Sequence, residues 1–226
     1  MRHIAGVLWR PRSTMAALVA TPTYLAAWLV LLVIGLSLAA ALLRTNIGRQ
    51  ALVDERVRVI EALGGRVDDE RYARLQNSPP YGAYVTSGGR LLLTPPVTLL
   101  VAAGLMALAR TDGARLPWAA AMAVSVHASA ALVVQQLVAT PLHFLRESIT
   151  SPTNLAVFLP MLEEGTVAAR VFGSIDLFGL WWMWLLALGV AAATGRPARR
   201  YLGRLLGVYV LVAVMVAAGM AVIGGS

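Results

Sequence analysis

The sequence predicts an all-α membrane protein, a polytopic bundle of five transmembrane helices. Hydrophobic residues make up 58% of its 226 residues, against about 45–50% in soluble domains. Charged residues make up only 13%, which is about half the usual share. Five apolar stretches also reach the roughly 17–25 residues that a helix needs to cross a bilayer. We therefore expect one membrane domain over residues 1–226, because little sequence is left for a separate soluble module.

The first span is expected at residues 22–43. Thr21 is suited to cap this helix, and Pro22 to occupy its first position, where the missing N–H of proline costs nothing. The second span is expected at residues 91–109. A Pro-Pro pair at 95–96 disfavours helix just before it, so we expect the regular helix to begin near these prolines and the preceding residues to be bent.

The remaining spans are expected at residues 117–139, 177–193 and 202–223, each bounded by Arg, Pro, Gly or Asp. With a cytoplasmic N-terminus, the connections on the opposite side are two outer loops, residues 44–90 and 140–176. An odd number of spans then places the C-terminus outside.

The arginines indicate this orientation. All nineteen basic residues are arginine, and the net charge is +8. The segments placed in the cytoplasm hold nine arginines in 39 residues, whereas the outer loops hold ten in 84. Arginine is enriched on the cytoplasmic side of membrane proteins, so the bias favours the N-terminus inside. The charge is suited to anionic headgroups rather than nucleic acid, because no basic run is interleaved with aromatic residues.

The first outer loop has helical periodicity. Apolar residues recur at helical intervals in residues 47–63, where Gly64 and Gly65 supply a stop signal, and a second helical piece is expected at residues 67–76. The simpler interpretation is a helical cap over the bundle. The alternative is a docking surface for another extracytoplasmic protein, with three aromatic anchors: Tyr72, Tyr81 and Tyr84.

Two further segments are expected at the membrane surface. The apolar run at residues 154–162 is shorter than a span, so we expect it to lie on or dip into the outer leaflet. Residues 11–20 are expected to form a short anchoring helix, with Arg10 and Arg12 near anionic headgroups.

The sequence offers little for catalysis. It has no cysteine, only three histidines and no HExxH spacing, so we expect no catalytic residue, no metal site and no cofactor. An enzyme is the least favoured alternative, and it would require four side chains to converge on one cleft: His143, Glu147, Glu163 and Glu164.

One ionisable residue lies well within a span. His127 shares a line with small residues spaced by four, which predicts that it faces protein rather than lipid. The simpler interpretation is a neutral histidine hydrogen-bonded to a neighbouring helix. The alternative is a polar path between helices, to which Gln135 and Gln136 would contribute.

Two segments carry a family resemblance. In residues 8–22, a proline-bearing surface segment precedes a span that starts at Pro22. Residues 174–190 contain, in order, an acid, a phenylalanine, tryptophans, a leucine-rich stretch and a glycine; the matching positions are Asp176, Phe178, Trp181 and Gly189. These segments resemble the first and fourth spans of the bacterial Yip-domain membrane proteins. Independently of the resemblance, Asp176 is placed to cap the fourth helix, and an outer aromatic belt is expected at Phe178, Trp181, Trp182 and Trp184.

The resemblance implies a five-span protein of the bacterial cytoplasmic (inner) membrane. Bacterial members of this kind resemble accessory subunits, some of them associated with ABC-type export systems. Eukaryotic members bind prenylated GTPases through a long cytosolic N-terminal region. Only about 21 residues precede the first span here, so GTPase binding is not expected.

These observations lead to one functional hypothesis and one alternative. The hypothesis is a non-enzymatic accessory or scaffold subunit of a transport or membrane-organising complex, with the lipid bilayer and other membrane proteins as partners. The alternative is a small channel or transporter with a polar path near His127. The sequence does not indicate a substrate or an oligomeric state.

Overall fold

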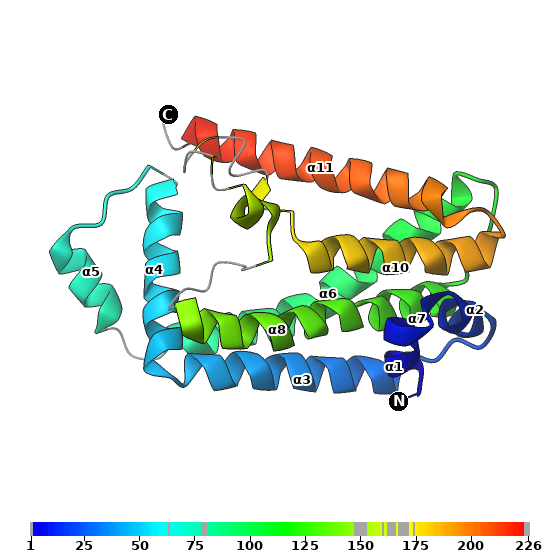
Figure 1. The fold of residues 1–226 in the computed structure, drawn as a ribbon, viewed down its shortest axis with the longest axis horizontal. Coiled ribbons are helices and arrows are strands. Elements are labelled where there is room, and N and C mark those ends of the chain that lie inside the picture. Colours follow the sequence, from blue (N-terminus) through cyan, green and yellow to red (C-terminus); the bar gives the residue numbers. More distant parts are fainter. Residues whose placement is uncertain are drawn as a thin grey trace. The chain divides into compact units, whose positions relative to one another are not determined.

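The computed structural model describes residues 2–62, 64–77, 81–146, 153–159, 161, 166, 172–173 and 175–223 (Figure 1). The secondary structure of these residues is helical, apart from one isolated bridge between Asn154 and Asp176. The helices are α1 (Arg2–Trp9), α2 (Pro11–Ala20), α3 (Leu25–Leu43), α4 (Asn46–Ala62), α5 (Asp69–Gln76), α6 (Tyr81–Arg110), α7 (Trp118–Ala128), α8 (Ala130–Arg146), the 3-10 helix η1 (Leu155–Phe158), α10 (Leu177–Thr194) and α11 (Ala198–Ile223). The all-α fold class is therefore confirmed.

Several helices are suited to a bilayer. Among the described residues, three helices are long and apolar enough to cross one: Leu92–Arg110 within α6, Trp118–Ala139 over α7 and part of α8, and α10. A shorter apolar helix, Leu25–Ala41, lies within α3. Large apolar side chains on these helices are exposed, as lipid-facing side chains are, with Leu92 at 75% and Leu100 at 71%. The helices support a multi-pass membrane protein, while the count of five spans and the sides of the termini remain predictions.

The chain folds into two compact units. The first comprises Met1–Gly35, Arg90–Gln135 and Phe178–Val208. The second comprises Leu36–Gly89, Gln136–Leu177 and Tyr209–Ser226. Each unit combines segments that are far apart in the sequence, so each depends on long-range packing.

The core of the first unit is built largely from alanine. In α7, every side chain from Ala120 to Ala128 is buried. Ala102 of α6 and Ala187 of α10 belong to the same cluster. Helices gain little in lipid from covering apolar side chains, so small residues that permit close van der Waals contact hold them together.

Gly189 of α10 lies directly against Val124 of α7. A Cβ added at Gly189 would lie 2.6 Å from Val124 Cγ2 and 3.0 Å from Val124 Cβ, and closer still to Cγ1. A side chain at this position would therefore require one of the two helices to shift. This glycine sets the distance between α7 and α10.

The N-terminal helices differ from the sequence expectation. α1 was not indicated by any pattern, yet α1 and α2 pack against one another and against α7 (Figure 1). α2 has the predicted bounds, but Met15 and Leu18 are fully buried, so this helix is part of the core rather than only a surface anchor. Thr21 does not cap the next helix, because its hydroxyl donates to the Ala17 carbonyl at 3.1 Å in the last turn of α2. As a result α3 begins at Leu25, three residues after Pro22.

The second expected span is also longer and more regular than predicted. α6 is helical through Pro95 and Pro96, where we expected regular helix only to begin. Each proline removes one backbone N–H, but membrane helices tolerate this loss when hydroxyl groups and neighbouring helices supply hydrogen bonds. The Thr98 hydroxyl donates to the Thr94 carbonyl at 2.8 Å and ties together the turn that contains the prolines.

The third expected span is divided. α7 ends at Ala128 and α8 begins at Ala130, so Ser129 interrupts the helix. The Ser129 hydroxyl donates to the Val126 carbonyl at 2.6 Å, and such bonds from a serine to the preceding turn bend helices.

The second unit contains the predicted outer-loop helices, α4 and α5. Gly64 ends the first of them with φ at 80°, and the N–H of Gly65 donates to the Ile60 carbonyl at 2.8 Å. The carboxylate of Asp68 caps α5 by accepting the N–H of Arg71 at 2.7 Å. The helical pair is confirmed, while its position over a bundle remains a prediction.

The orientation can be tested with single cysteines, because the chain has none of its own. Ala73 and Ser13 are both exposed, on α5 and α2. We expect a membrane-impermeant maleimide to label Ala73→Cys in intact cells and Ser13→Cys only after permeabilisation, because the arginine-rich segments stay inside. Labelling of Ser13→Cys alone in intact cells would invert the topology.

Replacing Gly189 should loosen the first unit. We expect Gly189→Ala to destabilise the detergent-solubilised protein by about 1–3 kcal/mol, the usual cost of overpacking. Adding Val124→Ala should recover part of the loss, since it removes the two methyl groups that the new Cβ meets. Gly104→Ala is the matched control, because nothing lies within 4 Å of its added Cβ. Thermal unfolding measures all three, and equal effects at positions 189 and 104 would contradict the packing role.

Candidate functional site

His127 is buried in the first unit and bonded within its own helix. Its side chain is 2% exposed, and its Nδ1 lies 2.9 Å from the Ala123 carbonyl. A carbonyl only accepts, so Nδ1 carries the proton in this bond. The ring also meets the His3 ring of α1 edge to face, with centroids 6.1 Å apart. The structure differs from the simpler sequence interpretation, because this bond is to the same helix rather than to a neighbouring one, and the contact with His3 was not anticipated.

The two glutamines lie further along the chain, on α8. Gln135 lies eight residues after His127, beyond the interruption at Ser129, and both residues belong to the first unit. Gln136 is assigned to the second unit, and none of the described residues bonds its buried Oε1.

A mainly apolar cavity of about 270 Å³, with a few polar side chains in its wall, lies in the first unit. It is lined by Leu93, Thr94, Val97, Thr98, Val101, Ser125, Ser129, Leu132 and Trp182. Ser125 is 3% exposed, and within the described part of the chain neither its hydroxyl nor the indole N–H of Trp182 has a hydrogen-bond partner. A cavity with unsatisfied polar groups of this kind can hold water or a small polar group. His127 does not line it.

A charged cluster ties the α6–α7 turn to the start of α11. The Asp112 side chain is only 2% exposed and lies 2.7 Å from Arg200 and 3.2 Å from Arg204. Arg204 also donates to the Thr111 hydroxyl at 2.7 Å. A hydrogen bond with Tyr201 and the two guanidinium groups hold the pKa of Asp112 below its usual value, against the opposing effect of burial.

This cluster bears on the topology. It joins residues 110–116 to residues 194–204, two segments that the sequence places in the cytoplasm. Segments in direct contact outside the spans must lie on one side of a membrane, as the expected topology requires. Sequence reasoning missed the contact itself, although Asp112 stands out as the one acid in the three arginine-rich segments.

The outer-loop helices of the second unit are cross-linked by polar side chains. The Tyr72 hydroxyl of α5 donates to Asp54 of α4 at 2.8 Å and accepts from Gln50 at 2.5 Å. Gln76 donates to Gln50 at 3.1 Å and forms a second link. The bond with Asp54 raises the pKa of Tyr72.

Of the three expected aromatic anchors, Tyr72 therefore has its hydroxyl engaged within the loop. Tyr81 and Tyr84 lie in the first turn of α6, and their side chains lie outside what the structure describes.

Asp176 joins the second outer loop to the start of α10. Its carboxylate accepts from the Thr153 hydroxyl at 2.5 Å, and the N–H of Leu177 donates to the Thr153 carbonyl at 3.2 Å. These bonds link the start of α10 to a distant segment, while the expected capping of the helix by Asp176 stays a prediction. Within 154–162, η1 is a short helix that Asn154 caps, whereas Pro160 and Leu162 lie outside the described residues.

The aromatic residues of α10 occupy different surroundings in the first unit. The rings of Phe178 and Trp181 meet at a tilted angle with centroids 6.1 Å apart. Trp182 and Trp184 line cavities, while the aromatic belt of these four residues stays a prediction.

Convergence of the four residues of the enzyme alternative stays a prediction. Glu147, Glu163, Glu164 and the side chain of His143 lie outside the described residues. Within the described part of the chain, no three His, Asp or Glu side chains gather as a metal site.

Comparison with known proteins gives one match. The family model described as the Yip1 domain matches residues 5–221, nearly the whole chain. No curated protein and no solved structure matches. The family match confirms the resemblance carried by residues 8–22 and 174–190.

The Asp112 cluster leads us to expect that the stability of the protein depends on pH. Because the folded pKa of Asp112 lies below 3.8, its contribution to stability is complete above that value and is lost as the pH falls through the folded pKa. We expect Asp112→Asn to lower the melting temperature in detergent near neutral pH, and the gap from wild type to close in acid below pH 3.8. Glu70→Gln, which breaks an exposed pair with Arg74, should leave the melting temperature unchanged. A gap that persists in acid would show that the carboxylate charge is not its source.

Proposed function

The chain belongs to the Yip1 domain family, and from this premise we propose that it is a non-enzymatic accessory or scaffold subunit of a membrane complex. The protein is a multi-pass membrane protein, and the proposed location is the bacterial inner membrane. The complex is a transport assembly of the ABC export type or a membrane-organising assembly. The family resemblance is the reason for preferring these two classes.

The observation that supports this role is the order of the outer loop. A loop between spans that served only as a linker would need no internal bonds. Here Tyr72, Asp54, Gln50 and Gln76 fasten α5 to α4, and Asp68 caps the second helix. The polar side chains of this network bond to one another, which leaves a pre-formed helical surface. Preformed surfaces bind partners without an added ordering cost.

The helical surface carries the side chains that a partner would meet. The exposed residues of α5 include both charge signs: Asp69, Glu70, Arg71 and Arg74. On α4, Val59 is 43% exposed. A mixed charged surface with an apolar contact is typical of the rim and centre of a protein interface.

The channel alternative has less support. His127 is 2% exposed and bonded to its own helix, and neither the 270 Å³ cavity nor the larger cavity of the first unit includes it. A polar path near His127 would need both imidazole rings to move, because His3 covers the ring edge to face. We therefore do not adopt this alternative.

The scaffold role predicts a stoichiometric partner. Purification from native membranes in mild detergent, followed by mass spectrometry, should recover at least one other membrane protein in fixed ratio. Tyr72→Phe removes the bond to Asp54 but keeps the ring, so the hairpin loosens and recovery of the partner should fall several-fold. Tyr24→Phe, in the first unit, is the matched control and should recover as much partner as wild type. Isolation of the wild-type chain alone would overturn the proposal.

A further inference from the structure

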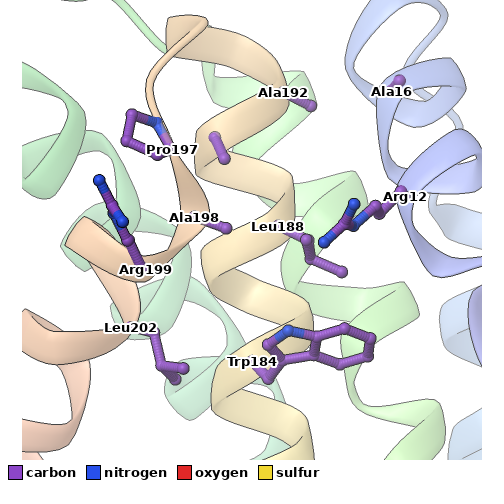
Figure 2. Close-up of a pocket in the computed structure, with 10 residues that line it drawn as sticks. Arg12, Ala16, Trp184, Leu188, Ala192, Pro197, Ala198, Arg199 and Leu202 are labelled. Atoms are coloured by element: carbon purple, nitrogen blue, oxygen red, sulfur yellow. The ribbon is translucent and has the colours of Figure 1, made fainter.

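A second cavity of the first unit opens between three helices. It has a volume of about 670 Å³ and lies against α2, α10 and the start of α11 (Figure 2). The lining residues are Arg12, Ala16, Trp184, Leu188, Ala191, Ala192, Pro197, Ala198, Arg199 and Leu202. This volume is within the range of about 300–1,000 Å³ typical of sites for small molecules.

The cavity extends from a turn into an apolar region. Pro197 and Ala198 lie at the turn between α10 and α11, whereas Trp184 lies ten residues before the end of α10. At 1.5 Å per residue, that separation is about 15 Å, or half of a hydrocarbon core of about 30 Å. Small side chains, Ala191 and Ala192, leave space beside the helix. One end of the cavity is therefore polar and the other apolar.

Two arginines flank the cavity. In Figure 2, Arg12 reaches from α2 toward Leu188, and Arg199 stands on the other side of α10 beside Pro197. Both are exposed, and among the described residues neither forms an ion pair.

The nearby acid does not neutralise these two arginines. Asp112 is the one carboxylate in the arginine-rich segments, and it is bonded to Arg200 and Arg204. Arg12 and Arg199 therefore keep their full charge at the cavity. Since arginine stays protonated at all physiological pH values, the site attracts an anion constantly.

From the shape and the charge, we propose that this cavity binds one anionic phospholipid of the bilayer. The phosphate of the headgroup pairs with one of the two guanidinium groups through charge-assisted hydrogen bonds, and the other arginine, across α10, adds to the positive field at the cavity. One acyl chain lies along Leu188 and Leu202 toward the Trp184 ring. A free phosphate would use only the polar end, and a neutral lipid only the apolar end. This site is independent of the outer-loop docking surface.

Native mass spectrometry of the purified chain tests the site. The protein is titrated with phosphatidylglycerol, with phosphatidylcholine of the same acyl chains, and with glycerol phosphate. We expect one phosphatidylglycerol to be retained in preference to phosphatidylcholine, and glycerol phosphate to bind far more weakly because it has no acyl chain. Equal retention of the two lipids, or equal binding of glycerol phosphate, would overturn the proposal.

Matched variants separate the site from general surface charge. Arg12→Gln with Arg199→Gln should weaken phosphatidylglycerol binding about 30-fold, from the usual contribution of each basic residue near anionic lipid. Arg10→Gln with Arg196→Gln removes the same charge from exposed arginines that do not line the cavity, and should change binding less than about threefold. Equal losses in the two pairs would assign the binding to the surface as a whole.

A third variant tests whether the lipid occupies the cavity itself. Ala192→Trp fills space at an exposed position of the cavity wall and keeps every arginine. It should reduce phosphatidylglycerol binding while leaving the melting temperature close to that of wild type. Unchanged lipid binding in this variant would show that the lipid binds outside the cavity.

Discussion

The close approach of α7 and α10 is the contact on which the first unit depends. In a bilayer, helices do not associate to escape water, so the distance between backbones decides how much dispersion energy they gain. Gly189 lets α10 come against Val124 of α7, a helix whose side chains from Ala120 to Ala128 are all buried. With α10 held in this way, Trp182 faces one cavity and Trp184 the other. A single glycine thereby fixes the walls of both spaces.

Polar groups in this protein have two very different surroundings. In the turn between α6 and α7, Asp112 is buried but paired on several sides, so its charge is compensated. In the 270 Å³ cavity, the Ser125 hydroxyl and the Trp182 indole have no bond within the described part of the chain. Burying a polar group without a bond costs free energy, so a cavity that retains two such groups is suited to a polar occupant. The sequence alone does not show which buried polar groups have partners and which do not, because the partners come from separate helices.

Much of the fold could be predicted from local patterns. Helical periodicity and capping residues placed α4, α5 and α10 within a few residues of their bounds, since these signals act between neighbours along one helix. The family resemblance rested on similarly local features at Pro22, Asp176 and Gly189. The features that were not predicted depend on contacts between segments that are distant in the sequence. Tertiary packing makes α1 a helix beside His127, and neighbouring groups let α6 continue through Pro95 and Pro96. The pairing of Asp112 with Arg200 and Arg204 spans about 90 residues of sequence, so periodicity carries no sign of it.

The Asp112 cluster carries a net positive charge. Two guanidinium groups share one carboxylate, so the net charge where the α6–α7 turn meets α11 is +1. The lowered pKa of Asp112 keeps its carboxylate charged except in acid. The ion pairs that connect the two segments thus also leave a positive charge at the ends of these helices. A substitution that weakens the connection therefore also changes the local charge.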